Sequence, residues 1–374
     1  MMQESRKIDK YRDDIYTCIR SRCGFCFSNC PIFLTKGLET YTSRGKSMII
    51  KAFLEGKIEL SEDLAKRFSQ CTNCGFCTTN CDVDRPDIFN AFKEDLIEAG
   101  YVIGSHERIC ESVCRYGNPY GEAKDYQIPL KYMSKIDDDS DVLFYAGCTA
   151  RFRERSIMEA MMEIMDRFAL LDEAVCCGSV LLRTGNRKEA EMQARKLKDL
   201  FQGYRTIVTA CAGCYNMLVE QYPKMGIELG PEILHSTQYI KRLMDQGRLH
   251  LSKIGTGIKA TYHDPCHIGR KDGIFEEPRY IIRAMGFELV EMPRNREGAL
   301  CCGAGGGYKS MEDDTATGIS RIRDTEAKST GADILITACP FCVRNLRDGG
   351  QGMDLSIVDI VELAANAKYR PDKV

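Results

Sequence analysis

Eighteen of the twenty cysteines fall into four spaced clusters of two kinds, and each kind occurs twice. The first kind has the spacing Cys-x2-Cys-x2-Cys-x3-Cys, and the second has a single Cys, then Cys-Cys-Gly, then Cys-x2-Cys. So many thiolates at regular spacing predict a fold built around bound metal, and the two kinds of spacing indicate two roles. The clusters of the first kind are Cys18, Cys23, Cys26, Cys30 and Cys71, Cys74, Cys77, Cys81; those of the second are Cys148, Cys176, Cys177, Cys211, Cys214 and Cys266, Cys301, Cys302, Cys339, Cys342.

Composition excludes several classes of function. The chain has 374 residues, 44% hydrophobic and 28% charged, which allows two or three globular domains. Its formal net charge of -2 gives no reason to expect nucleic-acid binding. Segment 1–7 is polar, unlike a signal peptide, and no stretch approaches the ~20 apolar residues of a membrane helix. We therefore expect free cysteines in a reducing cytoplasm, and membrane contact only through a partner.

The N-terminal part, 1–135, predicts a small helical unit around the first eight cysteines. Segment 44–53 has apolar residues at helical spacing, and 87–100 repeats the pattern with Gly100 as its cap. The acidic run 137–141 follows and indicates a domain boundary. The apolar stripe of the first segment consists of Met48, Ile49, Ala52 and Phe53.

The remainder is an internal duplication, with repeats at 136–256 and 257–374. Short apolar runs precede both the single Cys and the Cys-x2-Cys pair, and helical segments lie between them. This alternation predicts parallel α/β units, so the fold class is an α-helical ferredoxin domain followed by two pseudo-symmetric α/β repeats. Ligands collect beyond the carboxyl ends of such strands, so we expect the two cysteine sets to meet at a shared crevice. The matching runs are 142–145 with 260–263, and 206–210 with 335–338.

The clusters of the first kind predict two cubane [4Fe-4S] clusters. In this spacing three thiolates wrap one cluster and the fourth reaches the other. Zinc is the alternative, but it requires one closed set of four ligands. The chain departs from the pattern in the four residues between Cys18 and Cys23, and in Asp82 where a proline is usual. The predicted sets are Cys30, Cys71, Cys74, Cys77 and Cys18, Cys23, Cys26, Cys81.

The clusters of the second kind offer five thiols each, one more than a cubane or a zinc ion uses. Two successive thiolates bind one tetrahedral ion only with strain, because neighbouring Cα atoms lie 3.8 Å apart. Gly178 and Gly303 allow close approach of the backbone. Five thiols therefore predict either a cubane with a spare redox-active Cys or an irregular cluster with bridging thiolates.

The repeats resemble the cysteine-rich domain of heterodisulfide reductases. The resemblance lies in His-Asp-Pro-Cys-His at 263–267 and Cys-Cys-Gly-Ala-Gly-Gly-Gly at 301–307. With the ferredoxin unit in front, nearly the whole chain is similar to the fused catalytic subunit of the membrane-linked enzyme. This resemblance implies a noncubane [4Fe-4S] cluster on each five-cysteine set, and cleavage of a disulfide by the two clusters together. The family's type substrate is the heterodisulfide of coenzyme M and coenzyme B.

The same domain also occurs in iron-sulfur subunits of glycolate, D-lactate and glycerol-3-phosphate dehydrogenases. There the subunit relays electrons from a flavoprotein, and its motifs are often degraded. Both motifs are complete in this chain, which favours disulfide cleavage. Either function requires a redox partner, a membrane cytochrome b or a flavoprotein, because the chain has no flavin or nicotinamide fingerprint.

Disulfide reduction takes two electrons and two protons, whereas a ferredoxin cluster delivers one electron. Two facing irregular clusters would each supply one electron to one sulfur. His267 is the predicted proton donor because imidazole titrates near neutrality. His235 and His263 are weaker candidates, and a core or shielding role is favoured for His263. Basic residues near the motifs, Arg183, Arg270, Lys271 and Arg344, could meet an anionic substrate. The two remaining cysteines, Cys110 and Cys114, could form a redox pair or supply extra ligands, and the favoured interpretation is that they are buried small hydrophobes.

Overall fold

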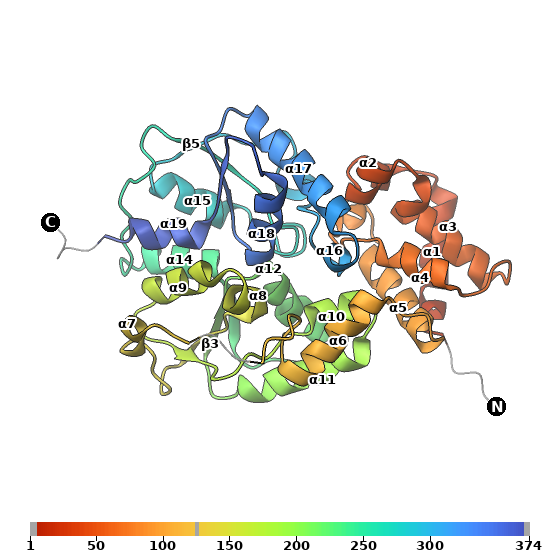
Figure 1. Cartoon of the computed structure of the whole chain (residues 1–374), viewed down its shortest axis with the longest axis horizontal. Coiled ribbons are helices and arrows are strands. Elements are labelled where there is room, and N and C mark those ends of the chain that lie inside the picture. The colour runs from red at the N-terminus through yellow and green to blue at the C-terminus, as the bar shows by residue number, and fades with distance from the viewer. Residues whose placement is uncertain (1–5, 124–126, 370–374) are drawn as a thin grey trace.

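The computed structural model describes residues 6–123 and 127–369, so residues 1–5 of the polar leading segment lie outside the described residues. Figure 1 shows a helical unit beside two α/β lobes, one formed by the middle of the chain and one by its C-terminal part. The described residues contain no helix that is both long and apolar enough to cross a membrane.

The first unit is helical, as predicted, and the described residues before 142 form no strand. Its core packs aromatic and aliphatic side chains, with Phe68 edge-on to Phe89 and Phe92. Gly100 ends α5 in the left-handed conformation, as expected (φ 88°). The elements are η1(Lys7–Tyr11), α1(Arg12–Ser21), η2(Phe25–Phe27), α2(Pro31–Lys36), η3(Glu39–Tyr41), α3(Ser43–Leu54), α4(Glu62–Ser69), η4(Phe76–Thr78), α5(Arg85–Glu98), α6(Gly104–Tyr116) and α7(Leu130–Met133).

The predicted apolar stripe of α3 is partly wrong. Met48 is 52% exposed, whereas Ile50, Phe53 and Leu54 are buried. Helix α3 presents a different face to the core than predicted because its first residues pack on η3. The approach is so close that a Cβ on Gly45 would lie 2.1 Å from the Glu39 carbonyl oxygen.

The first α/β lobe is a four-stranded parallel sheet in the order β2-β1-β3-β4. The predicted strands 142–145 and 206–210 are β1 and β3, which pair with each other. Its elements are β1(Val142–Phe144), α8(Gly147–Phe152), α9(Arg155–Ile164), β2(Ala169–Leu170), α10(Ser179–Thr184), α11(Arg187–Leu200), β3(Thr206–Thr209), α12(Ala212–Asn216), η5(Met217–Gln221), α13(Tyr222–Lys224), β4(Glu232–His235) and α14(Ser236–Asp245).

The second lobe repeats this topology, with parallel strands in the order β6-β5-β7-β8. The predicted strands 260–263 and 335–338 are β5 and β7. Its elements are β5(Lys259–Tyr262), α15(Glu276–Ala284), β6(Glu288–Leu289), η6(Arg296–Gly298), α16(Tyr308–Met311), α17(Asp313–Ser329), β7(Ile334–Thr337), α18(Pro340–Gly349), β8(Ser356–Asp359) and α19(Ile360–Ala367).

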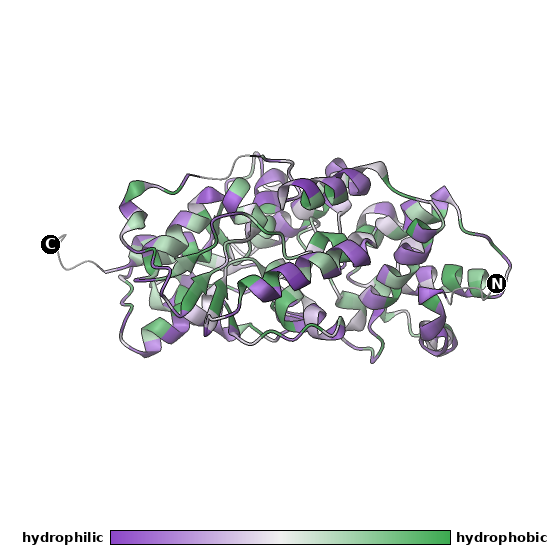
Figure 2. Cartoon of the chain, turned by 90° about the horizontal axis from the view of Figure 1, so that it is seen from below, coloured by the Kyte–Doolittle hydropathy of each residue, from purple (hydrophilic) through white to green (hydrophobic). Residues whose placement is uncertain are grey.

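The two lobes share a single hydrophobic core. Helix α9 of the first lobe packs on α19 of the second, and α15 of the second packs on α14 of the first. Figure 2 shows hydrophobic residues on the inner strands and polar residues on the outer faces of the helices. This packing of helices across the two lobes fixes the carboxyl ends of both sheets relative to each other.

Candidate active site and cluster-binding residues

The strands place both five-cysteine sets at the carboxyl ends of the sheets. Cys148 lies in α8, just after β1, and Cys211 is the residue between β3 and α12. Cys266 follows β5, and Cys339 precedes α18 in the same way. Because β1 pairs with β3 and β5 pairs with β7, each single Cys lies beside its Cys-x2-Cys pair.

Within each set the five thiols form one continuous series of contacts. In the first set the order is Cys148, Cys176, Cys177, Cys214 and Cys211, with 3.5 Å between the sulfurs of Cys177 and Cys214. The order in the second set is Cys266, Cys301, Cys302, Cys342 and Cys339.

The two sets meet through Cys211 and Cys339, whose thiols are in hydrogen-bonding contact. All ten cysteines are buried. They line one cavity of about 490 Å³ between the lobes, with further walls from Arg183, His267, Lys309 and Arg344. The expected shared crevice is therefore present as a cavity lined by sulfur.

Backbone geometry brings peptide N–H groups onto sulfur in the same way twice. Gly178 N–H donates to the Cys176 sulfur and Gly303 N–H to the Cys301 sulfur, at 3.4 Å in each case. Both glycines have positive φ, 80° and 93°, so a Cβ would be strained there. Peptide N–H groups aimed at sulfur are typical of iron-sulfur ligands.

The electrostatics of the two sets also suit thiolate ligands. Contacts from neighbouring thiols hold the pKa of Cys302 and of Cys211 well below the usual range. Hydrogen bonds with neighbouring thiols, and then burial and like charges, raise the pKa of most other thiols in the sets. Ten buried sulfurs with this mutual repulsion fit polynuclear metal clusters, which would take up the negative charge.

The eight cysteines of the helical unit lie in two similar loops, Cys-Gly-Phe-Cys at 23–26 and at 74–77. Gly24 and Gly75 both have positive φ, and Phe25 stacks on Phe76 with 5.1 Å between ring centroids. Cys30 lies in the electrostatic field of Cys71 and Cys74, as the crosswise predicted set requires. In the other predicted set, Cys18 and Cys23 lie near Cys26, while Arg85 links Cys81 (Nη2 to Sγ, 3.4 Å) to Cys23.

The helical unit touches the second lobe at a junction of two cysteine sets. Cys74 contacts the thiol of Cys301. Arg270 spans the junction: its Nη1 donates to the Cys74 carbonyl (3.0 Å) and its Nε to the Glu297 carbonyl (2.8 Å). Its Nη2 is buried and has no hydrogen-bond partner among the described residues. Arg270 therefore lies at the junction rather than in the wall of the cavity between the lobes.

His267 lines the cavity but does not titrate near neutrality. Burial and the nearby Arg183 guanidinium lower the pKa of His267 to about 3. Its imidazole is therefore neutral at pH 7 unless negative charge in the cavity raises the pKa. Its role as proton donor stays a prediction.

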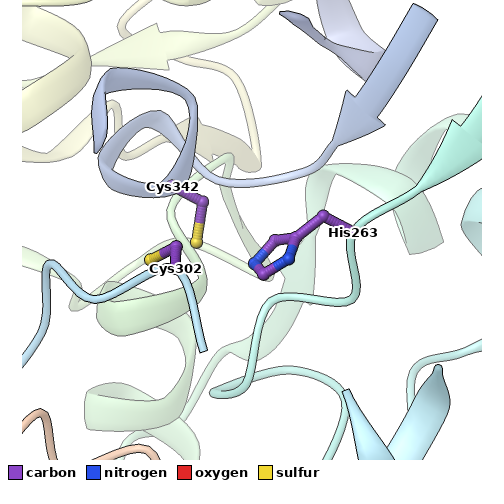
Figure 3. Close-up of side chains that lie close together, drawn as sticks. All are labelled: His263, Cys302 and Cys342. Atoms are coloured by element: carbon purple, nitrogen blue, oxygen red, sulfur yellow. The ribbon is translucent and has the colours of Figure 1, made fainter. Parts of the chain in front are cut away.

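The other two candidate histidines, His235 and His263, are buried. His235 caps α14 through Thr237, with 2.9 Å between Nδ1 and Oγ1, and burial lowers its pKa to about 4. His263 lies against the second set: one ring nitrogen faces the sulfurs of Cys302 and Cys342 (Figure 3), all within 4.8 Å of one another. This position agrees with the shielding role favoured for His263.

The basic residues have different environments. Arg183 is buried, and it donates to the Ser179 carbonyl (3.1 Å) and to Asn216 Oδ1 (2.8 Å). Lys271 faces Glu220 and packs over Gly75. Arg344 lines the cavity without an ion pair among the described residues, so it and Arg183 are the guanidiniums placed to meet an anionic group.

Cys110 and Cys114 lie on one face of α6 and contact each other, but neither lines the cavity. Cys114 is exposed. Burial, and then the charge of Cys114, raise the pKa of Cys110 to about 12, so Cys110 is unreactive at neutral pH.

Sequence reasoning missed several residues around the cavity. Tyr120 lies in the Gly/Pro/Tyr-rich connector 116–121 between α6 and α7; its hydroxyl oxygen is 2.9 Å from that of Thr149, and it forms part of the wall. Arg323 bonds His263 from 60 residues away. Lys309 enters the wall from α16. Only the Gly-Pro-Tyr composition of the connector hinted at Tyr120; the other two gave no local signal.

Comparisons with known proteins agree with this organisation. The chain matches the family of the cysteine-rich domain at 142–219 and 260–347, and the 4Fe-4S dicluster domain at 14–84. These matches confirm the predicted ferredoxin unit and the duplicated cysteine-rich unit.

Relatives match over most of the chain. One subunit of dihydromethanophenazine:CoB–CoM heterodisulfide reductase from Methanosarcina mazei is 33% identical, covering 93% of this chain and 93% of the relative. The matching subunit of fumarate reductase (CoM/CoB) from Methanothermobacter marburgensis is 27% identical over 97% of this chain and 76% of the relative. EtfAB:quinone oxidoreductase of Syntrophomonas wolfei is 26% identical over 90% of this chain and 55% of the relative.

Proposed function

Because the chain belongs to the family of this heterodisulfide reductase subunit, we propose that it reduces a small-molecule disulfide to two thiols in the cavity between its α/β lobes. At the coarser level, the chain is an iron-sulfur oxidoreductase related to heterodisulfide reductase subunits. The observation that carries the proposal is the meeting of two complete five-cysteine sets of buried residues, through Cys211 and Cys339, in one cavity.

We assign a noncubane [4Fe-4S] cluster to each five-cysteine set and two cubanes to the helical unit. When bound, the clusters supply electrons one at a time. The contact between Cys74 and Cys301 supports electron entry at the second set, and the contact between Cys211 and Cys339 supports passage to the first. The proposed domains are 1–135, 136–256 and 257–374, with the two lobes related by a pseudo-twofold axis.

The net reaction consumes two electrons and two protons for each disulfide, and its S–S bond becomes two S–H bonds. The protein's own residues shape this step. The ten cysteines that line the cavity are buried, and Arg183 and Arg344 in its wall favour anionic sulfur or an acidic substrate group. We keep His267 as the proton donor, since negative charge in the cavity would raise its pKa from about 3.

Electrons would enter from a redox partner at the outer cubane, the set that includes Cys23. Cys23 is the exposed cysteine among those eight, so this cluster lies nearest the surface. A membrane cytochrome b and a flavoprotein are the two partner classes proposed.

The test uses anaerobically prepared full-length protein. We expect about sixteen irons per chain, four for each [4Fe-4S] cluster. We also expect disulfide reduction with a reduced viologen, and a paramagnetic signal when a thiol is added to oxidised protein. Cys211→Ser should abolish the thiol-dependent signal, while Cys114→Ser, outside all four sets, should leave it intact. About eight irons and no disulfide turnover would overturn the proposal.

An electron-relay subunit is the second candidate, favoured by the similarity to EtfAB:quinone oxidoreductase. A relay would carry iron in all four sites, reduce no disulfide with any donor, and co-purify with a flavoprotein. Turnover with a panel of disulfides therefore separates the two functions.

A further inference from the structure

His263 is held between an arginine and the sulfurs of the second cysteine set. The Nε of Arg323 lies 3.1 Å from His263 Nδ1. A guanidinium carries donors and no acceptor, so Nδ1 must be the acceptor in this contact. A neutral His263 therefore carries its proton on the other nitrogen, Nε2.

That second nitrogen faces the sulfurs. Figure 3 shows a ring nitrogen directed at Cys302 and Cys342. His263 is 1% exposed, and Nε2 has no hydrogen-bond partner among the described residues. A buried N–H without a partner is costly, so a sulfur acceptor at this place would satisfy it.

Arg323, which bonds the imidazole of His263, is itself held in place. Arg323 is fully buried, and its Nη1 donates to Glu326 Oε2 (2.9 Å) and to the Arg294 carbonyl (2.8 Å). These bonds restrict the guanidinium, and through it the imidazole tautomer, as an outer partner does for a metal-site histidine.

The first lobe has no equivalent donor at the matching position. The run 142–145 matches 260–263, so Tyr145 occupies the place of His263. Its hydroxyl donates to the Val175 carbonyl at 2.7 Å and is therefore committed to the backbone. At this position the two cysteine sets thus differ in the polar group that they face.

We propose that the Nε2–H of His263 donates a hydrogen bond to the Cys302 sulfur, and that this bond gives the second cluster a higher reduction potential than the first. Hydrogen bonds to ligand sulfur stabilise the more negative, reduced state. Cys266, Cys301, Cys302, Cys339 and Cys342 would then hold the more easily reduced of the two noncubane clusters, next to Cys74. This inference rests on the proposed function only for the presence of a cluster on each five-cysteine set.

The test is a dye-mediated redox titration of the full-length holoprotein, followed by electron paramagnetic resonance. His263→Leu removes the donor, and His263→Gln keeps an N–H near the position of Nε2. We expect His263→Leu to weaken reduction of one noncubane cluster at least tenfold, which is about 59 mV for one electron. His263→Gln should restore most of the shift. Tyr145→Phe is the matched control and should leave both potentials unchanged. Equal potentials in wild type and His263→Leu would overturn the inference.

A measurement on the wild type covers the case in which His263→Leu does not assemble. With ¹⁵N-histidine, electron–nuclear double resonance of the second cluster should show a weak nitrogen coupling and an exchangeable proton. A strong coupling would indicate direct ligation by His263, and no coupling would indicate no contact; either result overturns the inference. A wild-type protein with about four irons fewer than the expected sixteen would instead reject the assignment of a cluster to each set.

Discussion

At Gly303 the second lobe leaves no room for a side chain. A Cβ there would lie 2.6 Å from the Ala316 carbonyl oxygen, and the residue has a φ of 93°. Gly273 has a similar left-handed backbone (φ 69°), but nothing lies within 4 Å of its added Cβ. The pair separates the cost of backbone strain from the cost of a clash next to Cys302, a proposed cluster ligand.

Gly273→Ala should therefore cost only the left-handed conformation, about 1–2 kcal/mol. Gly303→Ala should cost more and displace the adjacent Cys302, so we expect about four fewer irons per chain. Urea unfolding and iron analysis of both anaerobic variants measure the two effects. Full iron content in Gly303→Ala would show that the Cys-Cys-Gly turn tolerates a side chain.

Asp324 gives a pH dependence. It is fully buried in α17, and burial raises its pKa to about 8 despite a bond from Ser320. Between about pH 4 and 8 the folded protein keeps a proton that the unfolded chain releases, so stability falls as pH rises through this window. Asp324→Asn should remove this slope, on the order of a few kcal/mol, in urea unfolding between pH 5 and 8.5. The exposed Asp354→Asn should not change the slope.

Individual side chains also differ in how far their state could be predicted. The cysteine sets could be read from spacing alone, because ligand spacing is local. The state of His263 and His267 could not, since it depends on Arg323 and Arg183, which lie far away in the chain. Burial and the Arg183 guanidinium, which is near in space but far in sequence, lower the pKa of His267 far below that of a free imidazole.

Among the helices and strands, strands were more predictable than helix faces. The runs that became β1, β3, β5 and β7 are short and mostly buried, and β3 and β7 are rich in β-branched residues, so the local sequence located them. In α3 the polar Lys46 is buried, with Nζ 2.7 Å from the Gln70 carbonyl, while Met48 points outward. Periodicity could not foresee this, because packing on η3 and a buried ammonium override the apolar pattern.

The loop that carries Cys266 is anchored to α15 by a buried ion pair. Arg279 is fully buried and binds Asp264 through Nη1 (2.7 Å) and Nη2 (3.0 Å). Arg279→Met would leave Asp264 buried without its partner, so we expect a loss of about 3–5 kcal/mol. Arg242 binds Glu232 in a similar forked geometry at the surface.

Arg242→Met is therefore the matched control and should cost less than about 1 kcal/mol. Thermal unfolding of the two anaerobic holoproteins compares them directly. Similar losses in both variants would mean that Arg279 does not anchor the loop.

For the molecule as a whole, the decisive feature is the seam between the helical unit and the second lobe. A Cβ on Gly305 would lie 2.5 Å from the Thr72 carbonyl oxygen, and one on Gly306 2.2 Å from that of Cys71. The glycine run after Cys-Cys-Gly therefore allows the ferredoxin loop to reach the second cysteine set. The sequence predicted both partners of this contact but not the contact, because more than 200 residues separate them.

Arg270 holds this seam from the second lobe, so its removal tests the electron route. Arg270→Gln loses the charged hydrogen bond to the Cys74 carbonyl, which crosses the seam and is worth about 1.5–3 kcal/mol, so the docked arrangement should be at least about tenfold less populated. Hydrogen exchange should then accelerate at 71–75 and 297–306, and electrons given to the cubanes should reach the disulfide more slowly. Arg270→Lys keeps the charge but not the forked geometry, so it should resemble Arg270→Gln in hydrogen exchange. If Arg270→Gln shows normal hydrogen exchange and unchanged electron delivery, Arg270 does not control electron transfer between Cys74 and Cys301.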